Sequence, residues 1–202
     1  MFCVKTNREQ RTENIEQRTN PRSYMKRITV PLDAETIDDL EVGDEVLISG
    51  VIYTMRDAAH AKVVEIIKKN GKLPFDLQNQ VIYYCGPTPA KEGNVIGSCG
   101  PTTSSRMDVF TPLLLEHGLK GMIGKGERSV AVKDAIEKYG AVYFSAMGGL
   151  GAEYARDVKK SDVIAFPELG PEAIYKMEIE DFYAVVINDA KGNDFFVINQ
   201  YN

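Results

Sequence analysis

The sequence predicts an α/β fold with mixed sheets. Through most of the chain, short runs rich in Val, Ile and Tyr alternate with amphipathic helical stretches, which is typical of α/β proteins rather than of sandwiches or helical bundles. Towards the end, strand-like runs follow one another without helices between them, which indicates a mixed sheet or two sheets. A chain of 202 residues with 44% hydrophobic content can bury one compact core.

Strands are expected where runs of Val, Ile and Tyr lie between turn residues. In the alternating part these are residues 27–32, 45–53, 80–85, 95–99, 121–124, 141–146 and 162–166. Helices are expected where apolar residues recur at spacings of three and four, over residues 57–69, 105–117, 129–139 and 151–159. Three more strands are expected in the tail, over residues 173–180, 183–188 and 194–198, with the turn signal DAKGN joining the last two as a hairpin.

The first 24 residues differ from the rest of the chain. They are polar and arginine-rich, they contain the tetrapeptide EQRT twice, and they lack a hydrophobic face. We expect residues 1–24 to be a disordered leader or an artefact of the chosen start site. The fold is expected over residues 25–202 as a single domain.

Composition excludes several classes of function. A formal net charge of -5 argues against a nucleic-acid partner, which requires a basic face. No apolar run reaches the roughly 18 residues that span a bilayer, so no membrane association and a cytoplasmic location are expected. Three cysteines without CxxC spacing, together with two histidines, predict neither a disulfide framework nor a metal site. Cys85 and Cys99 are expected to be packed thiols.

The segment GPTTSSRMD at residues 100–108 has the composition of an anion-binding pocket. A glycine-proline turn is followed by four hydroxyl side chains and by Arg106, directly before the predicted helix over residues 105–117. The free N–H groups of a helical first turn would face whatever the turn encloses. The alternative is that Ser and Thr are ordinary helix caps and that Arg106 is solvated.

Two further polar segments follow predicted strands, where α/β proteins place their ligand sites. TMRDAAH at residues 54–60 contains Arg56, and IGKGE at residues 123–127 contains Lys125 between two glycines. Three cations around one cavity in an acidic protein imply a small polyanionic ligand such as a dicarboxylate. The alternatives are a pair between Arg56 and Asp57, and a solvated Lys125.

Two other features leave alternatives open. His60 falls one turn into the predicted helix over residues 57–69, so it is either a general base or a structural histidine. The segment MGGLG at residues 147–151 suggests either a tight turn before a closely packed helix or, less readily, a nucleotide-binding loop. It matches neither GxGxxG nor a Walker motif.

Four motifs in order carry a family resemblance: the three polar segments above and the tail ELGPEAIYKMEIEDFYAVVINDAKGNDFF at residues 168–196. The chain resembles the beta subunit, or C-terminal part, of the class I iron-sulfur hydro-lyases, the family of class I fumarase and tartrate dehydratase. The likeness covers residues 25 to about 198. It implies a swivelling β/β/α domain that closes over a 4Fe-4S cluster held by an alpha subunit, and the reversible addition of water to a dicarboxylate.

The resemblance also assigns roles to residues. Arg56, Thr103, Arg106 and Lys125 would bind the substrate, while Thr102, with Lys125, would act at the carbon whose proton is removed. The cluster cysteines belong to the alpha subunit, and a carboxylate of that partner is expected to activate Thr102. Fumarate is the expected substrate, with tartrate, mesaconate or a noncatalytic dicarboxylate-binding role as alternatives. A hetero-oligomer is expected, with a homodimer when the chain is isolated.

Overall fold

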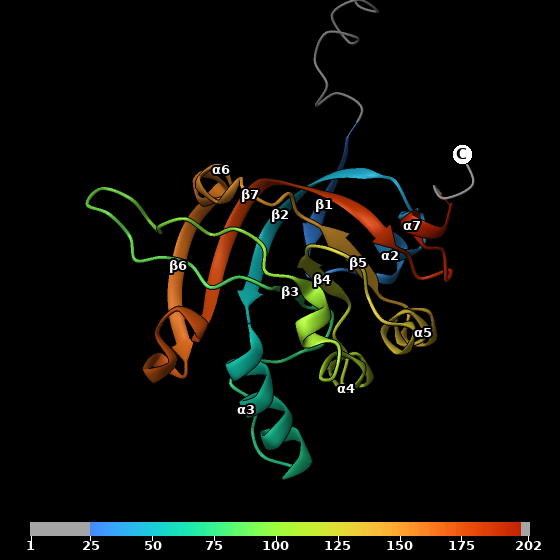
Figure 1. Cartoon of the computed structure of the whole chain (residues 1–202), viewed down its shortest axis with the longest axis horizontal. Coiled ribbons are helices and arrows are strands. Elements are labelled where there is room, and N and C mark those ends of the chain that lie inside the picture. Colours follow the sequence, from blue (N-terminus) through green and yellow to red (C-terminus); the bar gives the residue numbers. More distant parts are fainter. Residues whose placement is uncertain (1–24, 199–202) are drawn as a thin grey trace, which may run out of the picture.

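The computed structural model of the protein describes residues 25–198, so the expected disordered leader lies outside the described residues. Within this range the strands form one mixed sheet in the order β1-β2-β3-β4-β5-β7-β6 (Figure 1). The strands are β1 (Lys26–Val30), β2 (Glu45–Thr54), β3 (Val81–Tyr83), β4 (Gly121–Gly124), β5 (Val142–Ser145), β6 (Val158–Ala165) and β7 (Ile174–Asn188). The predicted α/β fold with a mixed sheet is confirmed.

Pairing of the strands produces a closed ring. Strands β1 to β5 pair in parallel with their neighbours, whereas β7 runs antiparallel to β5, to β6 and also to β2. Because β7 bonds to both β2 and β5, the strands β2, β3, β4, β5 and β7 enclose a core, and β1 and β6 extend from it. The carboxyl ends of β2 to β5 therefore lie along one edge of the ring.

Helices cover one outer face of the ring. The helical segments of the described chain are α2 (Ala34–Asp39), α3 (Asp57–Lys68), η2 (Ser104–Met107), α4 (Thr111–Glu116), α5 (Val130–Tyr139), α6 (Gly151–Asp157), η3 (Pro167–Glu172) and α7 (Phe195–Ile198). In Figure 1, α3, α4 and α5 lie together beneath the sheet. None of the helices within residues 25–198 is long and apolar enough to cross a membrane.

Alternation along the strands separates two hydrophobic clusters. In β3, Val81 and Tyr83 belong to the cluster inside the ring, and Ile82 between them packs with the covering helices. In β4, Ile123 faces the inside cluster and Met122 faces the helices. This division follows from the period of two residues in a strand, and burial on both faces explains the continuous apolar runs of the sequence.

Two expected elements differ in the structure. Residues 95–99 are not a strand, because the chain folds back on Thr88, whose N–H bonds to Ser98 and whose carbonyl accepts the Gly97 N–H. The helix expected over residues 105–117 is broken into η2 and α4, with Pro112 in the first turn of α4. Proline cannot donate the backbone hydrogen bond that a continuous helix needs there. The short helix α2, capped by Asp33, was not predicted.

The tail also differs from expectation. Residues 173–180 and 183–188 belong to one strand, β7, whose pairing with β2 shifts register opposite Ser49, where Asp181 has a φ of 55° and donates its N–H to the Ser49 hydroxyl. In the sequence, the polar residues Glu180 and Asp181 suggested a break between two strands, whereas the structure has a bulge within one strand. The turn at DAKGN is present and leads into one antiparallel bridge between Asn188 and Asp194, but the residues after it form α7 instead of a strand, because the Asp194 carboxylate accepts the Phe196 N–H and starts a helical turn.

Replacing Gly50 by alanine should destabilise the fold by at least about 2 kcal/mol. Gly50 has a φ of +122°, and a Cβ there would clash with the Val30 carbonyl oxygen of β1. Urea unfolding measures the loss. Gly93 has a similar φ of +82° but open space around it, so Gly93→Ala should cost about 1 kcal/mol. Equal losses in the two variants would contradict the close contact between β1 and β2.

Candidate functional site

The polar segments singled out in the sequence meet at the edge formed by the carboxyl ends of β2 to β5. Arg56 lies two residues beyond the end of β2, and Lys125 directly follows β4. Thr102 reaches the same edge because its N–H donates to the carbonyl of Tyr84, one residue past β3, at 2.6 Å. The segments with Arg56 and Lys125 follow strands, as predicted, whereas the strand expected directly before GPTTSSRMD is absent.

The hydroxyl segment lies directly beside Lys125. The Lys125 N–H donates to the Thr102 carbonyl at 3.3 Å, and the Lys125 carbonyl accepts the Ser104 N–H at 2.9 Å. Thr103 and Lys125 thus form an isolated parallel bridge that continues β4 by one residue. The side chain of Thr103 is exposed, while Thr102 and Lys125 are half-buried.

The two arginines meet at a single carboxylate. Arg106 donates its Nε–H to one oxygen of Asp57 at 2.9 Å, and its Nη2 lies 2.9 Å from the other. Nη2 of Arg56 lies 3.8 Å from that second oxygen and 3.1 Å from Glu172. Glu172 also accepts the Ala58 N–H and so anchors the first turn of α3. Asp57 and Glu172 were not predicted as site residues, because nothing in the sequence indicates what contacts them.

These carboxylates allow two cations to lie close together. At an effective dielectric constant of about 20, two like charges about 6 Å apart repel by roughly 3 kcal/mol, and an intervening carboxylate offsets this cost. The side chain of Arg106 remains 50% exposed and that of Arg56 22% exposed. The Nε of Arg56 is buried and has no hydrogen-bond partner among residues 25–198. Both guanidinium groups therefore keep donors for a further anion.

The expected helix N-terminus at GPTTSSRMD is not present. Segment η2 is a single turn whose Ser104 N–H is already bonded to Lys125. The alternative of an ordinary cap is also wrong, because Thr103 precedes the turn without a capping hydrogen bond from its side chain. The segment GPTTSSRMD therefore offers an anion its side chains rather than the dipole of a helix.

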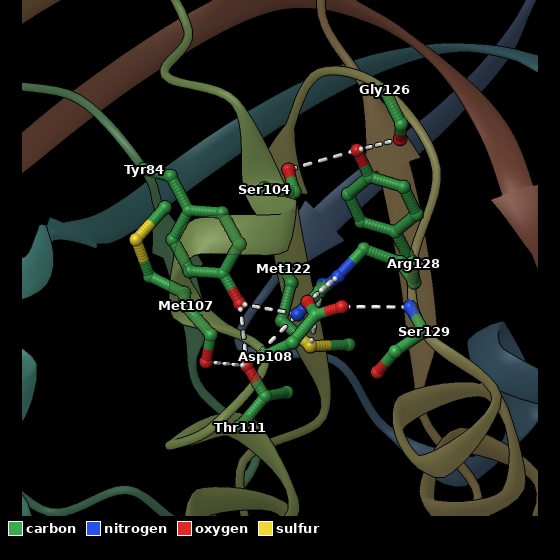
Figure 2. Close-up of polar contacts among 10 residues, drawn as sticks. Tyr84, Ser104, Met107, Asp108, Thr111, Met122, Gly126, Arg128 and Ser129 are labelled. Carbon is green, nitrogen blue, oxygen red and sulfur yellow. Dashed lines mark hydrogen bonds and ion pairs between the residues drawn. The ribbon is translucent and has the colours of Figure 1, made fainter.

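A buried ion pair that the sequence did not reveal fixes the two loops (Figure 2). Arg128 is fully buried and donates its Nε–H to Asp108 at 2.8 Å. The other oxygen of Asp108 accepts the Ser129 N–H at 2.7 Å. The guanidinium of Arg128 also donates to the Thr111 hydroxyl at 2.8 Å and lies over the rings of Tyr84 and Tyr143. Asp108 is the last residue of the segment GPTTSSRMD, and Arg128 directly follows the segment IGKGE that contains Lys125. The ion pair therefore joins these two loops.

Tyr143 adds a second link between the same loops. Its hydroxyl donates to the Gly126 carbonyl at 2.8 Å and lies 2.9 Å from the Ser104 hydroxyl (Figure 2). Burial raises the pKa of Tyr143 well above its usual value, so the phenol remains a neutral hydrogen-bond donor. These two contacts of Tyr143 fix the backbone that carries Thr102, Thr103 and Lys125.

His60 is a structural histidine. It is buried between Tyr84 and Phe110, and its Nδ1 bonds to the Arg56 carbonyl at 2.9 Å. Burial lowers its pKa to about 4, so the ring is neutral near pH 7. Its Nε2 is buried without a hydrogen-bond partner among the described residues. Through its hydrogen bond to the carbonyl, the ring fixes the backbone of Arg56.

The segment MGGLG closes the edge beside Lys125. A Cβ on Gly148 would lie 3.8 Å from both Cδ and Nζ of Lys125, and a Cβ on Gly151 would lie 2.9 Å from the Gly100 nitrogen. Gly149 has a φ of +87°. The segment is a tight turn, as expected, and its helix packs both on the sheet, where Tyr154 stacks on Phe182 of β7, and on the loop at Gly100.

Comparison with known proteins identifies the relatives of the chain. The sequence matches the family described as Fumarase C-terminus over residues 2–198. It is 41% identical over 170 residues to fumarate hydratase 2 of Leishmania major, which covers 82% of this chain and 30% of that protein. It is 44% identical over 157 residues to the anaerobic class I fumarate hydratase of Escherichia coli K12, covering 77% and 29%.

A third relative has nearly the same extent as this chain. The putative L(+)-tartrate dehydratase subunit beta of Methanocaldococcus jannaschii is 40% identical over 171 residues, which cover 82% of this chain and 88% of that protein. The chain therefore spans about 30% of the two fumarate hydratases but most of the tartrate dehydratase subunit.

Replacing Asp108 by alanine should lower the free energy of unfolding by about 3 to 5 kcal/mol, because Arg128 would remain buried without its partner. Chemical denaturation measures the change. The double variant Asp108→Leu with Arg128→Met should lose less than the single variant, since no charge stays buried. At the exposed pair of Glu153 and Arg156, Glu153→Ala should cost less than about 0.5 kcal/mol. Similar losses of unfolding free energy in Asp108→Ala and Glu153→Ala would contradict the role of the Arg128–Asp108 ion pair in holding the two loops together.

Acidification should destabilise the fold through His60. Its pKa is about 4 when folded and about 6.5 when unfolded, so only the unfolded chain gains a proton between these pH values. Unfolding free energy should therefore fall by about 3 kcal/mol from pH 6.5 to pH 4. His60→Asn should flatten this slope in urea unfolding. An unchanged slope in His60→Asn would refute the assignment.

Proposed function

The chain belongs to the fumarase C-terminus family, and from this premise we propose that it is the beta part of a hydro-lyase that adds water reversibly to fumarate to form malate. The observation that carries the proposal is the cationic edge, where Arg56 and Arg106 meet at Asp57 and Lys125 lies beside two threonines. The fumarate hydratases of Leishmania major and Escherichia coli that match this chain support the reaction.

The cations of this edge suit a substrate with two carboxylates. Each charge-assisted hydrogen bond is worth roughly 1.5 to 3 kcal/mol, so Arg56, Arg106 and Lys125 together can hold and orient a small dicarboxylate. As the proton leaves the carbon beside one carboxylate, negative charge accumulates there. Fixed guanidinium and ammonium groups stabilise that charge without reorganising.

Thr102 and Thr103 are assigned to the reacting end of the substrate. Their hydroxyl groups make no hydrogen bond to residues 25–198, so both are available to a ligand. A threonine hydroxyl is a weak base unless a neighbour accepts its proton. We assign that neighbour to a carboxylate of a partner chain, with Thr102 at the carbon that loses the proton and Lys125 beside it.

An iron-sulfur cluster is implied by the family, but the residues described here do not fit as its ligands. Cys85 and Cys99 are both fully buried. Contact with Cys99, together with burial, raises the pKa of the Cys85 thiol well above its usual value, which opposes the thiolate that a cluster needs. Within residues 25–198, no three His, Cys, Asp or Glu side chains gather as a metal site. The proposal places the 4Fe-4S cluster on an alpha subunit.

Tartrate dehydration is the second candidate. It is favoured by the Methanocaldococcus jannaschii relative, a beta subunit by name that this chain matches over 88% of its length. Tartrate carries a hydroxyl group where malate carries hydrogen, and an edge built mainly from carboxylate-binding cations discriminates weakly between the two. The same relative supports a two-chain enzyme in which this chain completes a site with an alpha subunit.

Anaerobic reconstitution of the chain with its alpha subunit should give fumarate hydration, and Arg106→Lys, Lys125→Met or Thr102→Ala should each lower kcat/KM by about 100-fold or more, because each removes a group that contacts the substrate in the transition state. Absorbance at the fumarate band measures the rate. Arg156→Ala, at an exposed cation of α6, is the matched control and should leave it unchanged.

Parallel assays with fumarate, tartrate and mesaconate decide the substrate. Faster turnover of tartrate or mesaconate would reassign it, while dicarboxylate binding without turnover of any would indicate a regulatory subunit. Near-native rates in both Arg106→Lys and Thr102→Ala would overturn the site.

A further inference from the structure

The pairing of Arg106 with Asp57 leaves one face of the guanidinium free. A guanidinium can bind a carboxylate with two parallel hydrogen bonds either at its side, through Nε and one Nη, or at its end, through both Nη atoms. Asp57 contacts Nε and Nη2, so it occupies the side. With half of the Arg106 side chain exposed, the end face is available to a second carboxylate.

We infer that Asp57 is a positioning residue that holds Arg106 by its side face and so presents the end face to one carboxylate of the substrate. This inference rests on the proposed function and adds a residue to its site. Asp57 is suited to the task because it is the first residue of α3, where the backbone is fixed by the helix and a negative charge is favoured. An unpaired Arg106 side chain would sample many rotamers and lose entropy on binding.

The same carboxylate sets the spacing of the two arginines. Its Oδ2 lies 2.9 Å from Nη2 of Arg106 and 3.8 Å from Nη2 of Arg56, so it lies between the two guanidinium groups. Glu172 contacts the same Nη2 of Arg56 at 3.1 Å. Each arginine is thus oriented by an acidic residue of the protein before any ligand arrives. Preorganised cations of this kind bind a dianion without first having to be ordered.

An opposing explanation makes a different prediction. If Asp57 occupied the place of a substrate carboxylate, it would compete with the ligand and have to leave on binding. Removing it would then tighten binding of a dicarboxylate. If it positions Arg106, removing it weakens binding, and the amide of Asn, which keeps one acceptor oxygen, weakens it less than Ala does.

Nuclear magnetic resonance of the full chain with labelled arginine side chains tests the geometry. In the wild type, the Nε–H signal of Arg106 should be shifted and protected from solvent exchange by its bond to Asp57, and this protection should disappear in Asp57→Ala. Titration with fumarate, and separately with tartrate, should give a dissociation constant at least tenfold weaker in Asp57→Ala, with Asp57→Asn in between. Asp38→Asn, at an exposed carboxylate of α2, removes the same charge and should match the wild type.

Kinetics of the reconstituted complex provide the second readout. Loss of positioning should raise KM at least tenfold in Asp57→Ala and by less in Asp57→Asn, with a smaller fall in kcat, whereas general destabilisation would lower the amount of active enzyme without changing KM. If Asp57→Ala binds a dicarboxylate more tightly than the wild type, the inference is wrong and the proposed function stands. The same holds if both its dissociation constant and its Arg106 signal are unchanged. A wild-type complex that neither binds nor hydrates a dicarboxylate overturns the proposed function and the inference together.

Discussion

The buried ion pair between Arg128 and Asp108 is the interaction on which the candidate site depends. It joins the end of the hydroxyl segment to the end of the Lys125 loop and, through the hydroxyl of Thr111 and the ring of Tyr84, ties both to β3 and α4 (Figure 2). A buried guanidinium is costly unless every donor is engaged, and here acidic, hydroxyl and aromatic groups surround it. Asp108 belongs to the loop that carries Thr102, and Arg128 belongs to the loop that carries Lys125. Burial of the ion pair therefore also brings Thr102 beside Lys125.

Sheet topology supplies the other half of the placement. Parallel strands β2 to β5 bring four strand-to-helix junctions to one edge, and β7 closes the ring behind them. Most of these strands could be predicted, since burial on both faces leaves continuous runs of Val, Ile and Tyr. Residues 95–99 carried a similar run and misled the prediction, because Ile96 is buried by the loop folding back on Thr88 rather than by strand pairing. The strand expected over residues 194–198 is absent for a different reason, because the Asp194 carboxylate accepts the Phe196 N–H and starts α7.

The site was predictable to the extent that its chemistry lies in residue types. Arg56, Arg106 and Lys125 stand out as cations after strands, and parallel topology brings such positions together. What orients them was not predictable, because Asp57 and Arg106 are 49 residues apart and Glu172 reaches Ala58 across 114 residues. The expected helix dipole also failed locally, where Pro112 restricts α4 and leaves one tight turn before it. Sequence patterns indicated which charged groups would lie near this edge, whereas tertiary packing determines how each side chain is oriented.

The distribution of charge explains why this edge is suited to binding an anion but not to accepting a proton. The carboxylates that touch its arginines, Asp57 and Glu172, are engaged in holding them, and Asp108 is buried against Arg128. Each of these carboxylates already contacts a guanidinium group, so they are poorly placed to take a proton from Thr102. The edge thus gathers three cations in an acidic chain but offers little general-base chemistry of its own. A second protein surface carrying a free carboxylate would complement it in both charge and reactivity, which is the physical basis for assigning the proton acceptor to the partner.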